Sequence, residues 1–174
     1  MKIINKLKIF SLFILMSCFS QADVIIDVTA KLIDPACTIR SKDNSKPLQI
    51  NFGSLNPELI NTPNSTRDFS IYISGCDSTN LAIIVTPKTN GAMSYNGRNI
   101  LSTNTSGLGI DLKQVNGTSV RDLEISKLQR IYPVKNSSTE SRLDLKAQLV
   151  NVGAIGDLAL GQFSTSATFT VTYN

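Results

Sequence analysis

The sequence predicts an all-β sandwich, and three observations support this fold class. Short segments alternate apolar and polar residues with a period of two, the pattern of strands with one buried face. Turn-forming dipeptides separate these segments at regular intervals. No long segment carries an apolar stripe with helical spacing, because the nearest candidate, residues 120–131, is cut short by Pro133.

The first expected elements lie in the N-terminal third of the chain. Residues 24–32 alternate, and their apolar face carries Val24, Ile26, Val28, Ala30 and Leu32. A short strand is expected around residues 37–39 and another over residues 47–52, which Gly53 ends. Residues 56–66 contain two prolines and several small polar residues, so we expect a loop with one helical turn.

The later elements continue the same pattern. Further strands are expected over residues 68–76, 81–87, 108–115, 143–150 and 161–174. Three dipeptides suited to tight turns lie between strand candidates: Asn90-Gly91, Asn96-Gly97 and Asn116-Gly117. About eight or nine short strands, with no internal repeat and no linker, favour one β-sandwich domain.

The closing segment, residues 161–174, has the clearest alternation in the chain. One face carries Gly161, Phe163, Thr165, Ala167, Phe169, Val171 and Tyr173. The residues between them are all polar, so this face is expected to meet the core and the other face water. The strand is expected to run to the last residue, and its free edge then requires a partner from elsewhere. Native proteins avoid such open edges because they template aggregation.

The first residues predict a secretory signal peptide. Lys2, Lys6 and Lys8 precede an apolar run, and residues 20–22 offer small side chains to a signal peptidase. We therefore expect residues 1–22 to be removed and the mature chain to begin at Asp23. Two alternatives remain open. The apolar run is too short to be a comfortable membrane anchor, and lipoprotein processing at Cys18 would place Met16 at an unsuitable position.

The mature chain is expected to have 152 residues (174 minus 22), which suits one domain. Removal of three lysines leaves 14 basic residues against 13 acidic ones, a net charge of +1. A net charge this small does not favour nucleic acid or an anionic membrane as a binding partner. Cys37 and Cys76 remain, and an even pair in an exported protein is expected to form a disulfide.

The residue types present argue against catalysis and metal binding. The chain contains no histidine, so neither a Ser-His-Asp nor a Cys-His arrangement is available, and two cysteines alone cannot supply the usual zinc ligands. The 13 acidic residues are scattered singly, which favours surface solvation over paired catalytic carboxylates. We expect neither an enzyme nor a cofactor, although a secreted β-sandwich enzyme is kept as a disfavoured alternative.

Taken together, the motifs resemble the pilin subunits of the chaperone–usher pathway. The signal peptide is followed by VIIDVTAKLIDPACTI, which contains the first cysteine of the mature chain. The second cysteine ends a later expected strand, in IYISGC. GLGIDL lies in mid-chain, Gly161 begins the last fourteen residues, and Tyr173 is the penultimate residue. These marks occur in order over the whole mature chain. The sequence is most similar to a one-domain, type 1-like minor pilin.

The resemblance implies an incomplete immunoglobulin-like β-sandwich that lacks its final strand. In this family a periplasmic chaperone lends a strand to the open groove, and its basic residues hold the C-terminal carboxylate of the subunit. At the outer-membrane usher, the N-terminal extension of the next subunit displaces the chaperone. This donor-strand exchange, a form of donor-strand complementation, completes the fold. The implied domains are a signal peptide (1–22), a donor extension (23–34) and a pilin domain (35–174).

The resemblance also implies roles for individual residues. The donor residues would be Val24, Ile26, Val28, Ala30 and Leu32. The acceptor groove or chaperone contact would comprise Gly161, Phe163, Ala167, Phe169, Val171 and Tyr173. Many relatives carry glycine where Ala30 stands. We therefore expect the methyl group of Ala30 to affect strand exchange. Alternatively, residues 24–32 form an ordinary edge strand of their own sandwich, and Tyr173 is simply a buried aromatic residue.

The function implied is that of a structural subunit of a fimbria, exported through the periplasm to the cell surface and contributing to cell adhesion through the pilus. Its partners would be the chaperone, the usher and neighbouring pilins, without nucleic acid. Alternatively, a minor pilin of this kind itself binds a host glycan. The loops over residues 86–99 and 135–141 contain polar side chains that suit sugar hydroxyls and solvated loops alike.

Overall fold

The computed structural model describes residues 37–45, 47–77 and 79–173, which lie in a compact unit spanning Asp34–Asn174. The predicted signal peptide and donor extension lie outside the described residues. Strands dominate this part of the chain, and its helical elements are three single 3₁₀ turns at Pro57–Leu59, Pro63–Ser65 and Ile155–Asp157. None of these described helices is long and apolar enough to cross a membrane.

The larger sheet is antiparallel throughout and has the strand order β1-β2-β10-β6-β5-β4. Two further strands join it, since β7 pairs with β6 and β9 pairs with β10. In chain order its members are β1 (Thr38–Ser41), β2 (Thr66–Ser74), β4 (Ala92–Tyr95), β5 (Arg98–Ser102), β6 (Leu108–Asn116), β7 (Ser119–Leu123), β9 (Val134–Lys135) and β10 (Glu140–Asn151).

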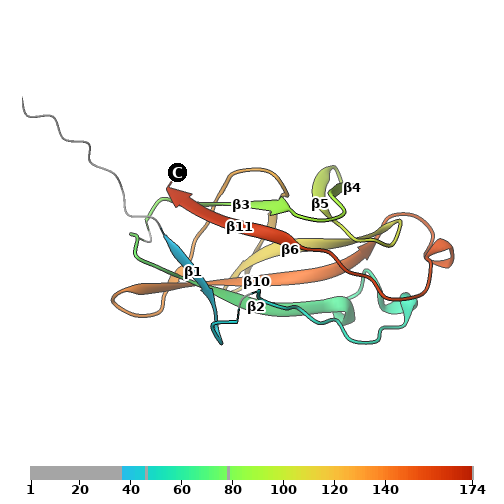
Figure 1. Ribbon diagram of the computed structural model, residues 1–174, viewed down its shortest axis with the longest axis horizontal. Coiled ribbons are helices and arrows are strands. Elements are labelled where there is room, and N and C mark those ends of the chain that lie inside the picture. Colours follow the sequence, from blue (N-terminus) through green and yellow to red (C-terminus); the bar gives the residue numbers. More distant parts are fainter. Residues whose placement is uncertain (1–36, 46, 78, 174) are drawn as a thin grey trace, which may run out of the picture. The chain divides into compact units, whose positions relative to one another are not determined.

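The smaller sheet has three antiparallel strands in the order β11-β3-β8. They are β3 (Leu81–Pro87), β8 (Gln129–Arg130) and β11 (Ala167–Tyr173). Figure 1 shows β3 and β11 in one layer and β2, β6 and β10 in the other, with the C-terminus at the end of β11. The strand β11 therefore lies at an edge of its sheet.

The core between the two layers follows from the alternation in the sequence. On β10 every second residue is buried, including Leu143 and Leu145, which pair with Ile71 and Phe69 of β2. The central strand β3 is a continuous apolar run and is accordingly buried on both faces from Leu81 to Ile83. Each large side chain buried in this way stabilises the fold by roughly 1.5–3 kcal/mol.

The predicted turn at Asn96-Gly97 is confirmed as the connection between β4 and β5. Both residues have positive φ, 48° at Asn96 and 76° at Gly97, as a two-residue type I′ hairpin requires. The loop over residues 56–66 contains two 3₁₀ turns instead of the one helical turn expected. The side chain of Asn56 accepts a hydrogen bond from the N–H of Glu58 at the start of the first turn.

Two expected strands differ markedly in the structure. Residues 47–52 do not form a strand, because no described segment pairs with their main chain. The closing strand begins at Ala167 instead of residue 161, since Ser164 exchanges hydrogen bonds with Asn104 and Ser166 donates to the hydroxyl of Thr89. These loop contacts replace a regular ladder. Residues 120–131 supply strand β8 and most of β7, and no helix.

Candidate functional site

A cleft of about 1700 Å³ lies beside the start of β11, where residues 167–169 line it, and β11 is an edge strand. Two chain segments line it, residues 47–55 and residues 158–169, and apolar side chains from the core strands also reach it. Those core residues include Phe69, Ile71, Leu101, Leu108, Leu112 and Leu149. The cleft therefore gives access to the apolar interior between the two sheets.

The main chain of β11 has hydrogen-bond groups on the side away from β3. The carbonyl of Ser166 accepts from the N–H of Lys88, so the even-numbered residues of β11 direct their main-chain groups toward β3. Alternation then places the N–H and C=O groups of Ala167, Phe169 and Val171 on the opposite edge. No strand among the described residues pairs with that edge. Such an edge is a ready template for an added strand.

Two aromatic contacts connect the inward face of this C-terminal segment to the rest of the sandwich. The ring of Phe169 meets that of Phe69 edge-on, with centroids 6.3 Å apart. The ring of Phe163 lies 6.1 Å from that of Phe52 in a tilted arrangement. Phe163 and Phe169 are only half-buried, so their rings retain surface that an added strand can cover.

The segment over residues 47–55 is held by a side chain from β2 instead of by a ladder. The Arg67 guanidinium donates to the carbonyl of Phe52 at 2.5 Å and to that of Asn51 at 3.3 Å. Its carbon also lies 5.6 Å from the centroid of the Phe52 ring. Arg67 thus fixes this wall of the cleft.

Further apolar side chains line the cleft. Leu55, Ile60 and Leu158 all contact it, together with Leu160. Leu160 is 82% exposed, the largest value among the exposed large hydrophobic residues of the described chain. A leucine so exposed beside an apolar cleft is typical of a surface that binds another molecule.

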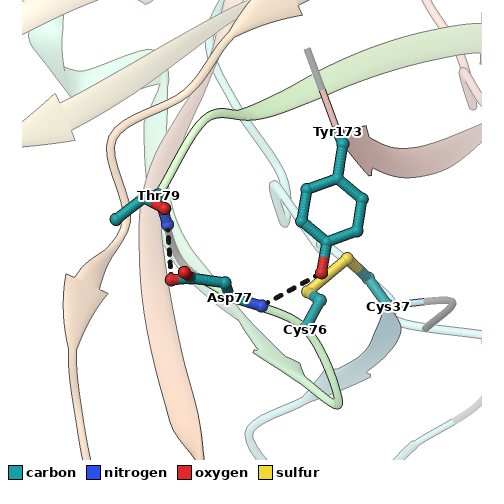
Figure 2. The surroundings of a disulfide bond; sticks show 5 residues. All are labelled: Cys37, Cys76, Asp77, Thr79 and Tyr173. Carbon is teal, nitrogen blue, oxygen red and sulfur yellow. Dashed lines mark hydrogen bonds between the residues drawn. A yellow bond between two sulfur atoms is a disulfide. The ribbon is translucent and has the colours of Figure 1, made fainter. Parts of the chain in front are cut away.

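The disulfide predicted from the sequence is present between Cys37 and Cys76, whose Cα atoms lie 5.1 Å apart. Figure 2 shows the hydroxyl of Tyr173 beside this bond, accepting a 3.1 Å hydrogen bond from the N–H of Asp77. The disulfide joins the start of β1 to the turn after β2, and Tyr173 ties the end of β11 to the same turn. The two sheets are therefore linked at this point.

The structure places the sequence-predicted acceptor residues in two groups. Gly161, Phe163, Ala167 and Phe169 line the cleft. Val171 and Tyr173 are not among the residues that line it: Val171 is buried in the core, and Tyr173 packs beside the disulfide. The predicted donor residues Val24, Ile26, Val28, Ala30 and Leu32 lie outside the described residues.

Sequence reasoning missed the opposite wall of the cleft and the apolar residues near Leu160. One signal was available for the wall, since Leu48, Ile50 and Phe52 alternate with polar residues. That alternation predicted a strand, but it did not reveal that the segment lines a cleft. No comparable periodic signal marks Leu158 or Leu160.

One acidic residue contradicts the expectation that the carboxylates are solvated. The side chain of Asp111 is 1% exposed and accepts two hydrogen bonds from Arg98, at 2.6 and 2.5 Å. Lys113 lies 3.3 Å from the same carboxylate. Burial lowers the pKa of Arg98, but the hydrogen bond and charge of Asp111 outweigh it and raise the pKa overall. The cluster ties β5 to β6, and within the described ranges no group of three metal-binding side chains occurs.

Comparison with known proteins identifies relatives of the whole chain. The fimbrial protein family matches residues 26–174. The chain is 30% identical over 172 residues to the fimbrial adapter PapF of Escherichia coli, covering 97% of this chain and 99% of that protein.

Solved structures show the same fold. The structure of the P pilus adaptor subunit PapF has a TM-score of 0.53 and 28% identity, covering 82% of this chain and 98% of that one. The crystal structure of the P pilus rod subunit PapA has a TM-score of 0.57 and 21% identity, covering 80% and 99%. The predicted all-β, immunoglobulin-like sandwich is confirmed. On the sequence match and the shared fold, this chain belongs to the family of fimbrial proteins, as its resemblance to chaperone–usher pilins predicted.

Proposed function

We propose that this chain is a structural subunit of a cell-surface fimbrium that joins its neighbours by donor-strand exchange. In this proposal the cleft beside β11 accepts the extension of one neighbour, and residues 23–34 enter the cleft of another. The observation that carries it is the coincidence of an unpaired strand edge with a cleft that opens onto the apolar core. An extended peptide added there gains main-chain hydrogen bonds from β11 and apolar contacts from the core.

The alternation of residues 23–34 matches what such a cleft requires. Every second residue from Val24 to Leu32 is apolar, so one face of an extended strand would meet the core of the acceptor. Each large side chain so buried contributes roughly 1.5–3 kcal/mol. Four of them, with the main-chain ladder, suffice for a joint without a covalent bond.

The partners follow from this mechanism. Before assembly the same cleft would be occupied by a strand of a periplasmic chaperone, and exchange would take place at the outer-membrane usher. The relative PapF is named a fimbrial adapter, and we assign this chain a comparable place as a minor component that joins two different subunits. Its role is structural and not catalytic, and its contribution to adhesion is made through the pilus.

Paired substitutions in the extension test the donor role. Ile26→Asp places a charge on the apolar face, whereas Thr29→Asp places the same charge on the other face. Ile26→Asp should keep its chaperone complex but disappear from purified fimbriae, while Thr29→Asp should be incorporated. Incorporation of both variants at the level of the unmodified chain would refute the donor role.

Peptide exchange tests the acceptor role. The chaperone-bound chain is mixed with peptides copied from the N-terminal extensions of candidate neighbours, and the complexes are identified by native mass spectrometry. At least one peptide should displace the chaperone and remain bound. Failure of every such peptide, while a known pilin exchanges under the same conditions, would refute the acceptor role.

A further inference from the structure

Thr165 has an unusual environment within the cleft. Among the residues that the structure describes, it alone has a buried side-chain oxygen or nitrogen without a hydrogen-bond partner. It lines the cleft, and on the inward face it lies between Phe163 and Ala167. Its two neighbours on this face are therefore apolar side chains.

The main chain on both sides of Thr165 is fixed in place. Ser164 accepts from and donates to Asn104, at 3.2 and 2.7 Å, and Ser166 donates to the hydroxyl of Thr89 at 2.9 Å. Movement of the segment is therefore a costly way to find a partner for the hydroxyl. Rotation about χ1 is easier, because threonine has more than one favourable rotamer. Because the rest of the half-buried side chain lines the cleft, such a rotation would turn the hydroxyl toward it.

Binding of a strand in the cleft changes which hydrogen-bond partners the Thr165 hydroxyl can reach. In the empty cleft, water can reach a hydroxyl that turns outward. A strand seated against β11 and residues 161–166 displaces that water and encloses Thr165. A buried hydroxyl left unpaired then opposes binding, whereas a hydroxyl on the incoming strand restores the hydrogen bond. Cβ atoms directly opposite on antiparallel strands lie about 4.5–5.5 Å apart, within reach of such a Thr–Ser or Thr–Thr pair.

We propose that Thr165 selects a strand carrying serine or threonine at the inward position opposite to it. This inference rests on the proposed function, because it assumes that a strand enters the cleft. It has a consequence for self-assembly. The inward positions of the chain's own extension are all apolar, from Val24 to Leu32, so a second copy would leave the Thr165 hydroxyl unpaired. The cleft therefore favours a different subunit over a copy of itself.

A peptide series tests the selection. The parent peptide copies residues 23–34, and five derivatives carry serine at one inward position each. Dissociation constants are measured for the unmodified mature chain and for Thr165→Val, which replaces the hydroxyl by a methyl group of similar size. Comparing the same peptide on the two proteins cancels the loss of apolar surface that serine causes. Thr170→Val, on the exposed face and outside the cleft lining, is the matched control.

One serine peptide should bind the unmodified chain about tenfold more tightly than Thr165→Val, the scale of one buried hydrogen bond. The parent peptide should show the opposite preference by about fivefold. Thr165→Ser, which keeps a hydroxyl, should restore the preference for the serine peptide. An equal ratio of the two dissociation constants across all six peptides would overturn the selection by Thr165. Absence of binding by all six peptides to both proteins would also overturn the selection, because serine opposite Thr165 should then permit binding. The proposed strand acceptance itself is overturned only when the neighbour-derived peptides of the exchange assay fail as well.

Discussion

Truncation of Phe169 tests whether the inward face of β11 binds an added strand. Phe169 lines the cleft and packs edge-on against Phe69, with ring centroids 6.3 Å apart. It is half-buried in the empty cleft, and an inserted strand should bury the remainder of its ring. The substitution Phe169→Ala therefore removes more contact from the filled cleft than from the empty one.

The magnitude follows from that difference in burial. Phe→Ala at a fully buried site costs about 3–5 kcal/mol, so the filled state should lose about 4 kcal/mol. The half-buried ring of the empty state should lose only about 2 kcal/mol. The difference of about 2 kcal/mol is the expected loss of binding free energy, and it corresponds to a roughly 30-fold weaker affinity for the strand.

The assay is the dissociation constant of a donor peptide for the unmodified chain, Phe169→Ala and Thr170→Ala. Thr170 lies on the same strand, is exposed and does not line the cleft, so its truncation should change the affinity by about twofold or less. Circular dichroism establishes that each variant is folded before binding is measured. Equal affinities for Phe169→Ala and Thr170→Ala would refute the assignment of this face to strand binding.

Three further predictions concern stability and ionisation. Cys37→Ser should lower the free energy of unfolding by about 4 kcal/mol, since the disulfide spans 39 residues, and a loss below about 1 kcal/mol in denaturant unfolding would contradict this. Asp111→Ala should lower the free energy of unfolding by about 3 kcal/mol in the same assay, because it leaves Arg98 without its buried partner. An unchanged unfolding midpoint would contradict a stabilising role for this ion pair. Hydrogen bonds from the hydroxyl and the N–H of Ser45 lower the pKa of Asp43 from 3.8 to about 2, so the linked stability is present above pH 3.8 and lost as the pH falls through about 2. NMR titration should show this pKa return toward 3.8 in Ser45→Ala, and a value near 3.8 before substitution would contradict the assignment.

The parts of the fold set by local patterns were predictable from sequence. The alternation over β2 and β10 gave the buried faces correctly, because a strand with one face on the core must repeat every two residues. The turn at Asn96-Gly97 was equally predictable, since few residue pairs adopt positive φ at both positions. The disulfide followed from the even number of cysteines in an exported chain.

The parts that depend on a partner were not predictable from local pattern. Residues 47–52 alternate as a strand does, yet pairing requires a neighbour, and the cleft occupies that position. Residues 161–166 alternate equally well, but contacts with Asn104 and Thr89 draw their main chain out of a ladder. Burial of Asp111 depends on Arg98, which lies 13 positions away in the sequence and on another strand. None of these long-range contacts leaves a periodic signal.

Hydrogen exchange along β11 tests the central claim, that this sandwich is unfinished and accepts a strand, most directly. The amides of Thr168 and Thr170 face β3 and should be protected in the unoccupied chain. The amides of Ala167, Phe169 and Val171 face the open edge and should exchange rapidly until a donor peptide is added, then become protected. Protection of these three amides in the monomeric chain without any added strand would contradict the account.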